Sequence, residues 1–173
     1  MFRFTIRHLI CNNGSEHLES VVLCFWPNAC SCLAIGPGVD LVPGLLEGAE
    51  KAMAQAKSKS AFVLTAVGSL TEVTLRMAHA GTTGGQQNSN EIKILTGPFE
   101  ILSLVGTFAA DKSKHLHMTV SDSTGAAFGG HVVDGKIFTT LELVLGTIDE
   151  VSFDRMHDER TGYRELVVRP GNN

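Results

Sequence analysis

The feature that most constrains the fold is a long series of strand-like segments beginning near residue 61. In these segments apolar and β-branched residues dominate or alternate with polar ones, and Gly, Pro or Asp-Gly often separates neighbouring segments. The predicted strands cover residues 61–67, 71–78, 91–96, 99–108, 115–121, 126–133, 136–145, 151–155 and 165–168. Asp134-Gly135 lies between two such runs and indicates a tight hairpin. A chain with this pattern folds mainly as an antiparallel sheet.

One segment has helical periodicity instead. A short strand over residues 33–35 is followed by the breaker Gly36-Pro37-Gly38, after which Asp40 is placed to cap a helix that ends near Lys57. Pro43 falls in the first turn, where proline is tolerated. The apolar stripe consists of Val42, Leu45, Leu46, Ala49, Met53 and Ala56. The prediction is an α+β fold with one main helix packed on one face of a mostly antiparallel sheet. The sheet forms either a sandwich or a barrel-like structure.

Composition excludes several functional classes. The chain has 173 residues and a formal net charge of −4, so it has no excess of Lys and Arg to neutralise nucleic-acid phosphates. The apolar run over residues 21–26 is far shorter than the ~20 residues of a membrane span. All four cysteines lie within the first 32 residues without zinc-finger spacing, and we interpret them as ordinary thiols. Residues 80–90 are polar and are predicted to form a loop.

Three histidines form the most specific candidate site. On a strand, His115 and His117 point to the same face, while Leu116 points into apolar packing. His131 follows a Gly-rich turn, and a returning strand would place it opposite the pair. Three imidazoles that converge can bind a transition metal, with zinc favoured by ligand type. In the alternative, the histidines only form hydrogen bonds with one another or with backbone carbonyl groups.

Several motifs in order resemble the plant- and prokaryote-conserved (PPC) domain family. They are Gly36-Pro37-Gly38-Val39-Asp40-Leu41, Thr65-Ala66-Val67-Gly68-Ser69-Leu70, Leu95-Thr96-Gly97-Pro98-Phe99-Glu100-Ile101-Leu102-Ser103-Leu104, His115-Leu116-His117-Met118-Thr119-Val120-Ser121, Gly129-Gly130-His131, Thr140-Leu141-Glu142 and Thr161-Gly162-Tyr163. The resemblance places the family domain at residues 33–168. Residues 1–32 would then be an N-terminal extension and residues 169–173 a C-terminal tail.

The resemblance implies a single α+β domain that assembles as a homotrimer. It also makes His115, His117 and His131 the family's histidine cluster, which suggests a zinc site. In plant members the domain follows an AT-hook in nuclear proteins and contacts other nuclear factors. This chain has no Arg-Gly-Arg-Pro run, and Pro98 stands where the plant motif has arginine, so stand-alone prokaryotic members match better. The expected location is intracellular, cytoplasmic or nuclear.

Further candidate residues lie on the predicted strands. The segment Gly97, Pro98, Phe99, Glu100, Ile101 and Leu102 reads either as a bend with a core phenylalanine or as a partner or subunit contact. Glu100 and Glu142 are candidates to line the pocket or to orient a ligating imidazole. Glu142 could equally be a plain exposed acid.

The first functional hypothesis is a stand-alone, trimeric domain that acts through assembly and partner binding, in a DNA-associated setting. The alternative is a zinc-dependent enzyme or small-ligand-binding protein that uses the three histidines. The sequence contains no nucleophile elbow, no His-Glu-x-x-His motif and no phosphate-binding loop, which ranks catalysis below binding. Direct DNA binding is the weakest hypothesis because the chain is acidic and lacks an AT-hook.

Overall fold

The computed structural model describes residues 24–26, 30–78 and 91–171. The elements follow in the order β1 (Cys24–Trp26), β2 (Cys30–Ile35), α1 (Leu41–Ala56), β3 (Ser60–Arg76), β4 (Ile92–Ala109), β5 (Lys114–Ser121), β6 (Ala127–Thr147), β7 (Val151–Asp158) and β8 (Tyr163–Pro170). Most of the predicted extension (residues 1–32) and the whole predicted loop at residues 80–90 lie outside the described residues. No helix within the described residues is long and apolar enough to cross a membrane.

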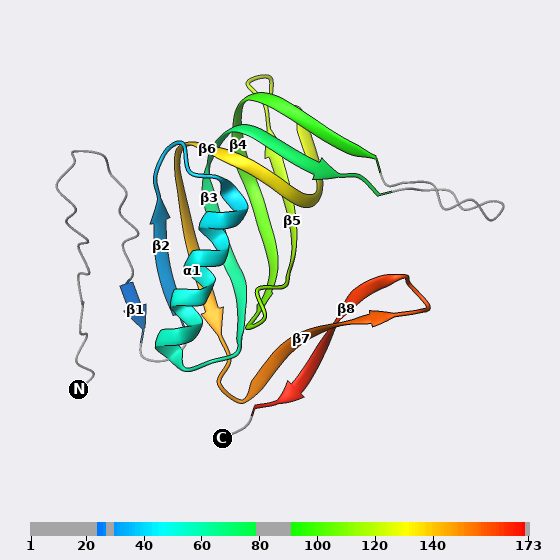
Figure 1. Cartoon of the computed structure of the whole chain (residues 1–173). Helices are drawn as coiled ribbons and strands as arrows, with labels where there is room; N and C mark the ends of the chain where they lie inside the picture. Colours follow the sequence, from blue (N-terminus) through cyan, green and yellow to red (C-terminus); the bar gives the residue numbers. More distant parts are fainter. Residues whose placement is uncertain (1–23, 27–29, 79–90, 172–173) are drawn as a thin grey trace.

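The main sheet has six strands in the order β1-β2-β6-β3-β4-β5, and β6 also pairs with β5. The pairing therefore runs from β6 through β3, β4 and β5 back to β6. All of these pairings are antiparallel. The hairpin of β7 and β8 forms a separate two-stranded sheet, while α1 lies along one face of the main sheet (Figure 1). The expected α+β fold, a mostly antiparallel sheet with one packed helix, is confirmed.

The helix has the predicted bounds but a different cap. Asp40 is the N-cap residue and makes no side-chain capping bond, contrary to our expectation. The backbone N–H of Val42 instead donates to Oδ1 of Asp134 at 3.1 Å. Asp40 pairs with Lys136 at 3.2 Å. The carboxylate that satisfies the first turn thus comes from β6, 92 residues away, and ties the helix to the sheet.

Three predicted breaks between strands, after residues 67, 96 and 133, are wrong because the chain stays extended through each of them. Gly68-Ser69 lies inside β3, Gly97-Pro98 inside β4 and Asp134-Gly135 inside β6. A Cβ atom at Gly68 would lie 2.2 Å from the Thr140 carbonyl oxygen, and one at Gly135 would lie 2.8 Å from that of Glu72. These two glycines therefore allow long strands to approach closely instead of reversing the chain. Pro98 sits opposite the β3 irregularity between Leu70 and Glu72, where a missing N–H is tolerated.

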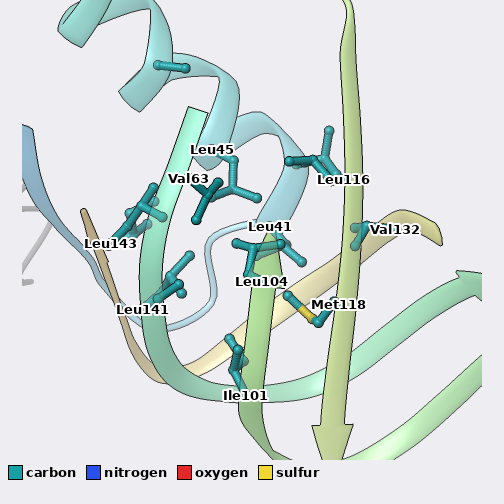
Figure 2. Close-up of a cluster of buried hydrophobic side chains, with 14 of the residues drawn as sticks. Leu41, Leu45, Val63, Ile101, Leu104, Leu116, Met118, Val132, Leu141 and Leu143 are labelled. Atoms are coloured by element: carbon teal, nitrogen blue, oxygen red, sulfur yellow. The ribbon is translucent and has the colours of Figure 1, made fainter. Parts of the chain in front are cut away.

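The core lies between α1 and the concave face of the sheet. Leu41 and Leu45 of the helix are fully buried, and Leu104, Leu116 and Met118 of β4 and β5 are at most 2% exposed. Figure 2 shows these side chains with Leu141 and Leu143 of β6 in one cluster. Each fully buried leucine contributes about 1.5–3 kcal/mol of transfer free energy. Leu116 and Met118 anchor β5 and leave the alternate positions of that strand facing outward.

Gly106 is a sensitive point of this sheet, because its φ is +147° and an added Cβ would lie 2.0 Å from the His115 carbonyl oxygen. Gly106→Ala should lower the free energy of unfolding by about 2–5 kcal/mol, from backbone strain of about 1–2 and overpacking of about 1–3. Urea unfolding followed by circular dichroism measures this loss.

Gly125→Ala is the matched control, since Gly125 has φ +84° with nothing within 4 Å of its Cβ position. It should lose only the backbone strain of about 1–2 kcal/mol. An equal decrease in the free energy of unfolding of the two variants would contradict the close approach of β4 and β5.

Candidate metal centre and its pocket

The structure brings together the three histidines. β5 supplies His115 and His117, with Leu116, Met118 and Val120 buried on the opposite face as predicted. β6 returns antiparallel to β5, and its register places His131 directly opposite His117. The turn before β6 is closed by the N–H of Gly125, which donates to the Asp122 carbonyl oxygen at 3.0 Å.

The imidazole rings are close enough to share one ion. Their centroids are 5.0, 5.1 and 5.4 Å apart, and one ring nitrogen from each lies within 4.8 Å of the others. Tetrahedral zinc, with Zn–N bonds of about 2.0–2.1 Å, needs nitrogens roughly 3.3 Å apart. Small side-chain rotations would therefore suffice.

Hydrogen bonds assign the protons of two rings. Nη2 of Arg155 donates to Nδ1 of His115 at 3.0 Å, so the proton of the neutral His115 ring belongs on Nε2. That Nε2 lies 3.0 Å from Nε2 of His117, which then acts as acceptor. The Nε2 lone pair of His117 accepts this hydrogen bond, and it becomes available to a metal once the His115 proton moves to Nδ1.

Both less exposed rings are held neutral. Burial, followed by the charge of Arg155, lowers the pKa of His115 below its ordinary value. Burial and then the charge of Arg76 lower the pKa of His131 to about 4. Neutral imidazole is the form that ligates metals, so this environment prepares the donors.

An unsatisfied atom supports a metal as the missing partner. Among the described residues, Nδ1 of His131 is the buried side-chain polar atom without a hydrogen-bond partner. A buried polar atom of this kind costs roughly 1–3 kcal/mol unless something satisfies it. The donor set, three imidazoles with room for a fourth ligand, fits zinc.

A cavity of about 360 Å³ opens beside the cluster. His115 and His131 form part of its wall, and the remainder comes from β3, the start of β5 and the residues before it, and the β7–β8 hairpin. The charged side chains that also line the cavity are Arg76, Lys112, Lys114, Arg155, Arg164 and Glu165. No local spacing in the sequence indicated these residues, because they come from four separate segments and no two of them form a known motif.

Neither predicted acid reaches the histidines. Glu142 pairs with Ala34 and Val67, and it lines a different hollow with Cys32 and Val144. Glu100 pairs with Ser121, four residues beyond His117 or about 13 Å along the strand. The carboxylate that does line the histidine cavity is Glu165, whose Oε1 accepts a hydrogen bond from Oγ1 of Thr161 at 2.8 Å.

The proposed contact segment of β4 divides into two faces. Phe99 and Ile101 are 6% and 5% exposed and pack in the hydrophobic core. They cannot form a surface contact, which favours the core interpretation of Phe99. Pro98, Glu100 and Leu102 are exposed, and Gly97 is half-buried. The prediction of a partner contact is retained for the exposed residues.

Comparison with known proteins gives a family match and a fused relative. The profile of the Plants and Prokaryotes Conserved (PCC) domain matches residues 32–149, which end before β7. The bifunctional protein GlmU of Synechococcus sp. (strain JA-2-3B'a(2-13)) is 40% identical over 139 residues, or 80% of this chain and 20% of that protein. The chain thus spans about a fifth of the length of the curated relatives it matches.

Three solved structures have the same fold. A hypothetical protein from Salmonella cholerae-suis has a TM-score of 0.68 and 30% identity, covering 89% of this chain and 99% of that one. A proposed DNA-binding protein from Bacteroides thetaiotaomicron has a TM-score of 0.67, 19% identity and coverage of 85% and 96%. A metal-containing protein from Archaeoglobus fulgidus has a TM-score of 0.64, 23% identity and coverage of 84% and 98%.

The depressed pKa of His131 predicts a pH-dependent stability of the metal-free protein. Between pH 6.5 and about 4 the unfolded chain binds a proton at His131 that the folded chain does not. Stability should therefore be fully present above pH 6.5 and fall as the pH drops toward 4. Histidine proton NMR of the metal-free protein should show one ring that titrates near pH 4.

His131→Gln should remove part of this pH dependence, whereas His157→Gln, which changes an exposed histidine of β7, should retain it. A titration in which every histidine has an ordinary pKa near 6.5 would contradict the burial of the cluster.

Proposed function

Because the chain belongs to the Plants and Prokaryotes Conserved (PCC) domain family, we propose that it is a homotrimeric binding module whose subunits each hold a zinc ion. The carrying observation is the convergence of His115, His117 and His131, with a buried Nδ1 that lacks a partner. The metal-containing relative from Archaeoglobus fulgidus supports the assignment of a metal to this fold. Zinc is favoured because all three donors are imidazoles.

Two of the histidines differ in how readily they can bind a metal. His117 presents its Nε2 lone pair, while His115 must move its proton from Nε2 to Nδ1 before it can ligate. With three protein ligands, a bound zinc ion would polarise a fourth ligand from the cavity as a Lewis acid.

A second candidate function, a zinc-dependent enzyme or small-ligand-binding protein, is favoured by that cavity. Glu165 is then the carboxylate placed to accept a proton.

Assembly is supported by an apolar surface on the outer face of β3 and β4. Leu64, Val67, Leu102 and Val105 are 50–57% exposed. The register pairs Phe62–Thr107 and Ser69–Glu100 bracket these positions, so all four residues lie on the stretches of β3 and β4 between two paired regions. Exposed apolar side chains gathered on two such strands favour a subunit contact. Three subunits follow from the family resemblance.

The DNA-associated setting has weaker support. Its support is the similar structure from Bacteroides thetaiotaomicron, which is described as a proposed DNA-binding protein. The net charge of −4 and the missing AT-hook favour contact with other proteins over direct contact with DNA.

The metal assignment predicts about one zinc per subunit by elemental analysis of the full chain. His117→Ala should lose the zinc, and because His117 is exposed, the variant should still fold. His157→Ala is the matched control and should keep the metal. Wild-type protein that is purified without metal, and whose thermal stability does not change on adding zinc, would refute this part of the proposal.

The assembly proposal predicts a trimer by sedimentation velocity at micromolar concentration. Val105→Asp should shift the protein to monomers, because burying an unpaired carboxylate at a subunit contact costs several kcal/mol. Val168→Asp is the control, since Val168 is 54% exposed on β8, away from this surface. A monomeric wild-type protein would rule out the trimer.

A further inference from the structure

We propose that the cavity beside the three histidines binds the oxyanion group, carboxylate or phosphoryl, of a small molecule. The inference deepens the proposed function, on which it rests, by naming the class of ligand that would occupy the open side of the metal centre. It depends on the charges that line the cavity, on the absence of a carboxylate partner for three of them and on the position of Arg155.

Positive charge is concentrated at this one place. Arg76, Lys112, Lys114, Arg155 and Arg164 line the cavity, against one lining carboxylate, Glu165. These five are more than a third of the chain's 14 lysines and arginines, although the whole chain carries a net charge of −4. A concave site lined by one sign of charge concentrates ligands of the opposite sign.

The cations differ in whether they have acidic partners. Lys112 pairs with Glu50 at 3.0 Å, and Arg164 with Asp111 at 3.2 Å. Within the part of the chain that the structure describes, Arg76, Lys114 and Arg155 have no carboxylate within 4 Å. Three charges on the wall of one cavity are therefore left for a ligand to neutralise.

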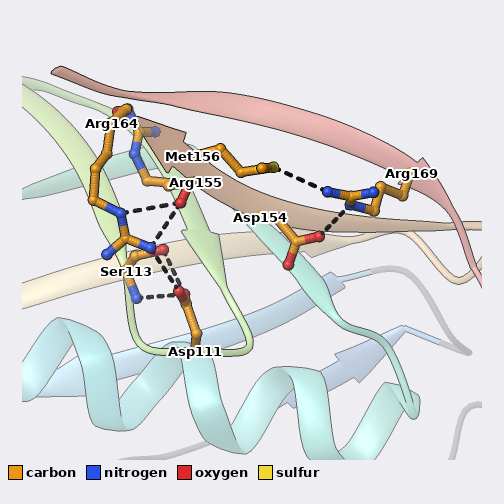
Figure 3. A network of polar contacts seen from close by, with 7 residues as sticks. All are labelled: Asp111, Ser113, Asp154, Arg155, Met156, Arg164 and Arg169. Carbon is orange, nitrogen blue, oxygen red and sulfur yellow. Dashed lines mark hydrogen bonds and ion pairs between the residues drawn. The ribbon is translucent and has the colours of Figure 1, made fainter. Parts of the chain in front are cut away.

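Of the three cations, Arg155 gives the strongest support for a bound anion. Its residue is only 9% exposed, and its Nη2 donates to two neutral acceptors, Nδ1 of His115 at 3.0 Å and the Arg164 carbonyl oxygen at 2.8 Å. Arg164 returns two bonds to the Arg155 carbonyl oxygen, at 3.0 and 2.7 Å (Figure 3). A guanidinium that is buried without a counter-ion is costly, and a bidentate oxyanion would offset that cost.

Arg76 lines the cavity from β3, whereas Arg155 lines it from β7. The guanidinium carbon of Arg76 lies 5.3 Å from the centre of the Tyr163 ring, a cation–π distance. Lys114 begins β5, immediately before the first histidine.

The bond between Arg155 and His115 links the two halves of the site. If Nε2 of His115 ligates a metal, the remaining proton of the ring lies on Nδ1, which can no longer accept from Arg155. Arg155 must then find another acceptor, and a ligand oxygen in the cavity is well placed to supply one. A volume of about 360 Å³ suits a small molecule.

Isothermal titration of inorganic phosphate and of succinate into the metal-free full chain, at constant ionic strength, tests the inference. At least one anion should bind saturably in the millimolar range or tighter. Arg76→Gln and Lys114→Gln should each weaken binding about tenfold, the value expected for one hydrogen bond to a charged group. These residues are half-buried rather than core, and circular dichroism checks that the variants fold.

Lys51→Gln is the matched control, because it removes the same charge from an exposed helix lysine that pairs with Glu47. The anion affinity of this variant should stay within about twofold of the wild-type value, since no contact with the bound anion is lost. No saturable binding of either anion, or equal weakening by Lys51→Gln and Arg76→Gln, would overturn the inference. Zinc content is measured separately. Zinc binding without anion binding refutes only this inference, whereas anion binding without zinc refutes only the metal assignment.

Discussion

The structure depends on the 21-residue strand β6, which pairs with β5 at one end and with β2 at the other. Between these ends it follows β3 through several register shifts, and Gly68 and Gly135 permit the close crossings. A strand of this length must bend to keep its pairings, and glycine makes the bend possible. The same strand places His131 opposite His117 and supplies Asp134 to the first turn of α1.

The buried face and the functional face of β5 arise from one alternation. Leu116 and Met118 fill the core beneath α1, which leaves His115 and His117 on the outer side. The stability of the core therefore fixes the direction of the imidazole rings, and Arg155 orients His115 further through its Nδ1. His115 and His131 remain neutral because burial and nearby cations lower the pKa of both rings. A bound metal would give the buried Nδ1 of His131 a partner, and a bound anion would neutralise the buried guanidinium of Arg155.

The sequence predicted the pieces of the site better than its surroundings. The spacing of His115 and His117 was enough to place both on one face, because strand periodicity is local. Of the two interpretations of Glu142, the structure favours the exposed acid, since the register of β6 places it at another hollow. Gly97-Pro98 and Asp134-Gly135 carry strong turn chemistry, yet both lie within strands, because long-range pairing overrode the local preference.

By itself, the sequence determined the helix between residues 41 and 56, the antiparallel character of the sheet and the three imidazoles, since each follows from periodicity within a few residues. Only the tertiary structure decided which charges surround those imidazoles. Arg76, Lys114 and Arg155 lie on β3, β5 and β7, and no local pattern relates them. Their meeting depends on how the sheet closes and where the final hairpin packs, and both are set by non-local contacts.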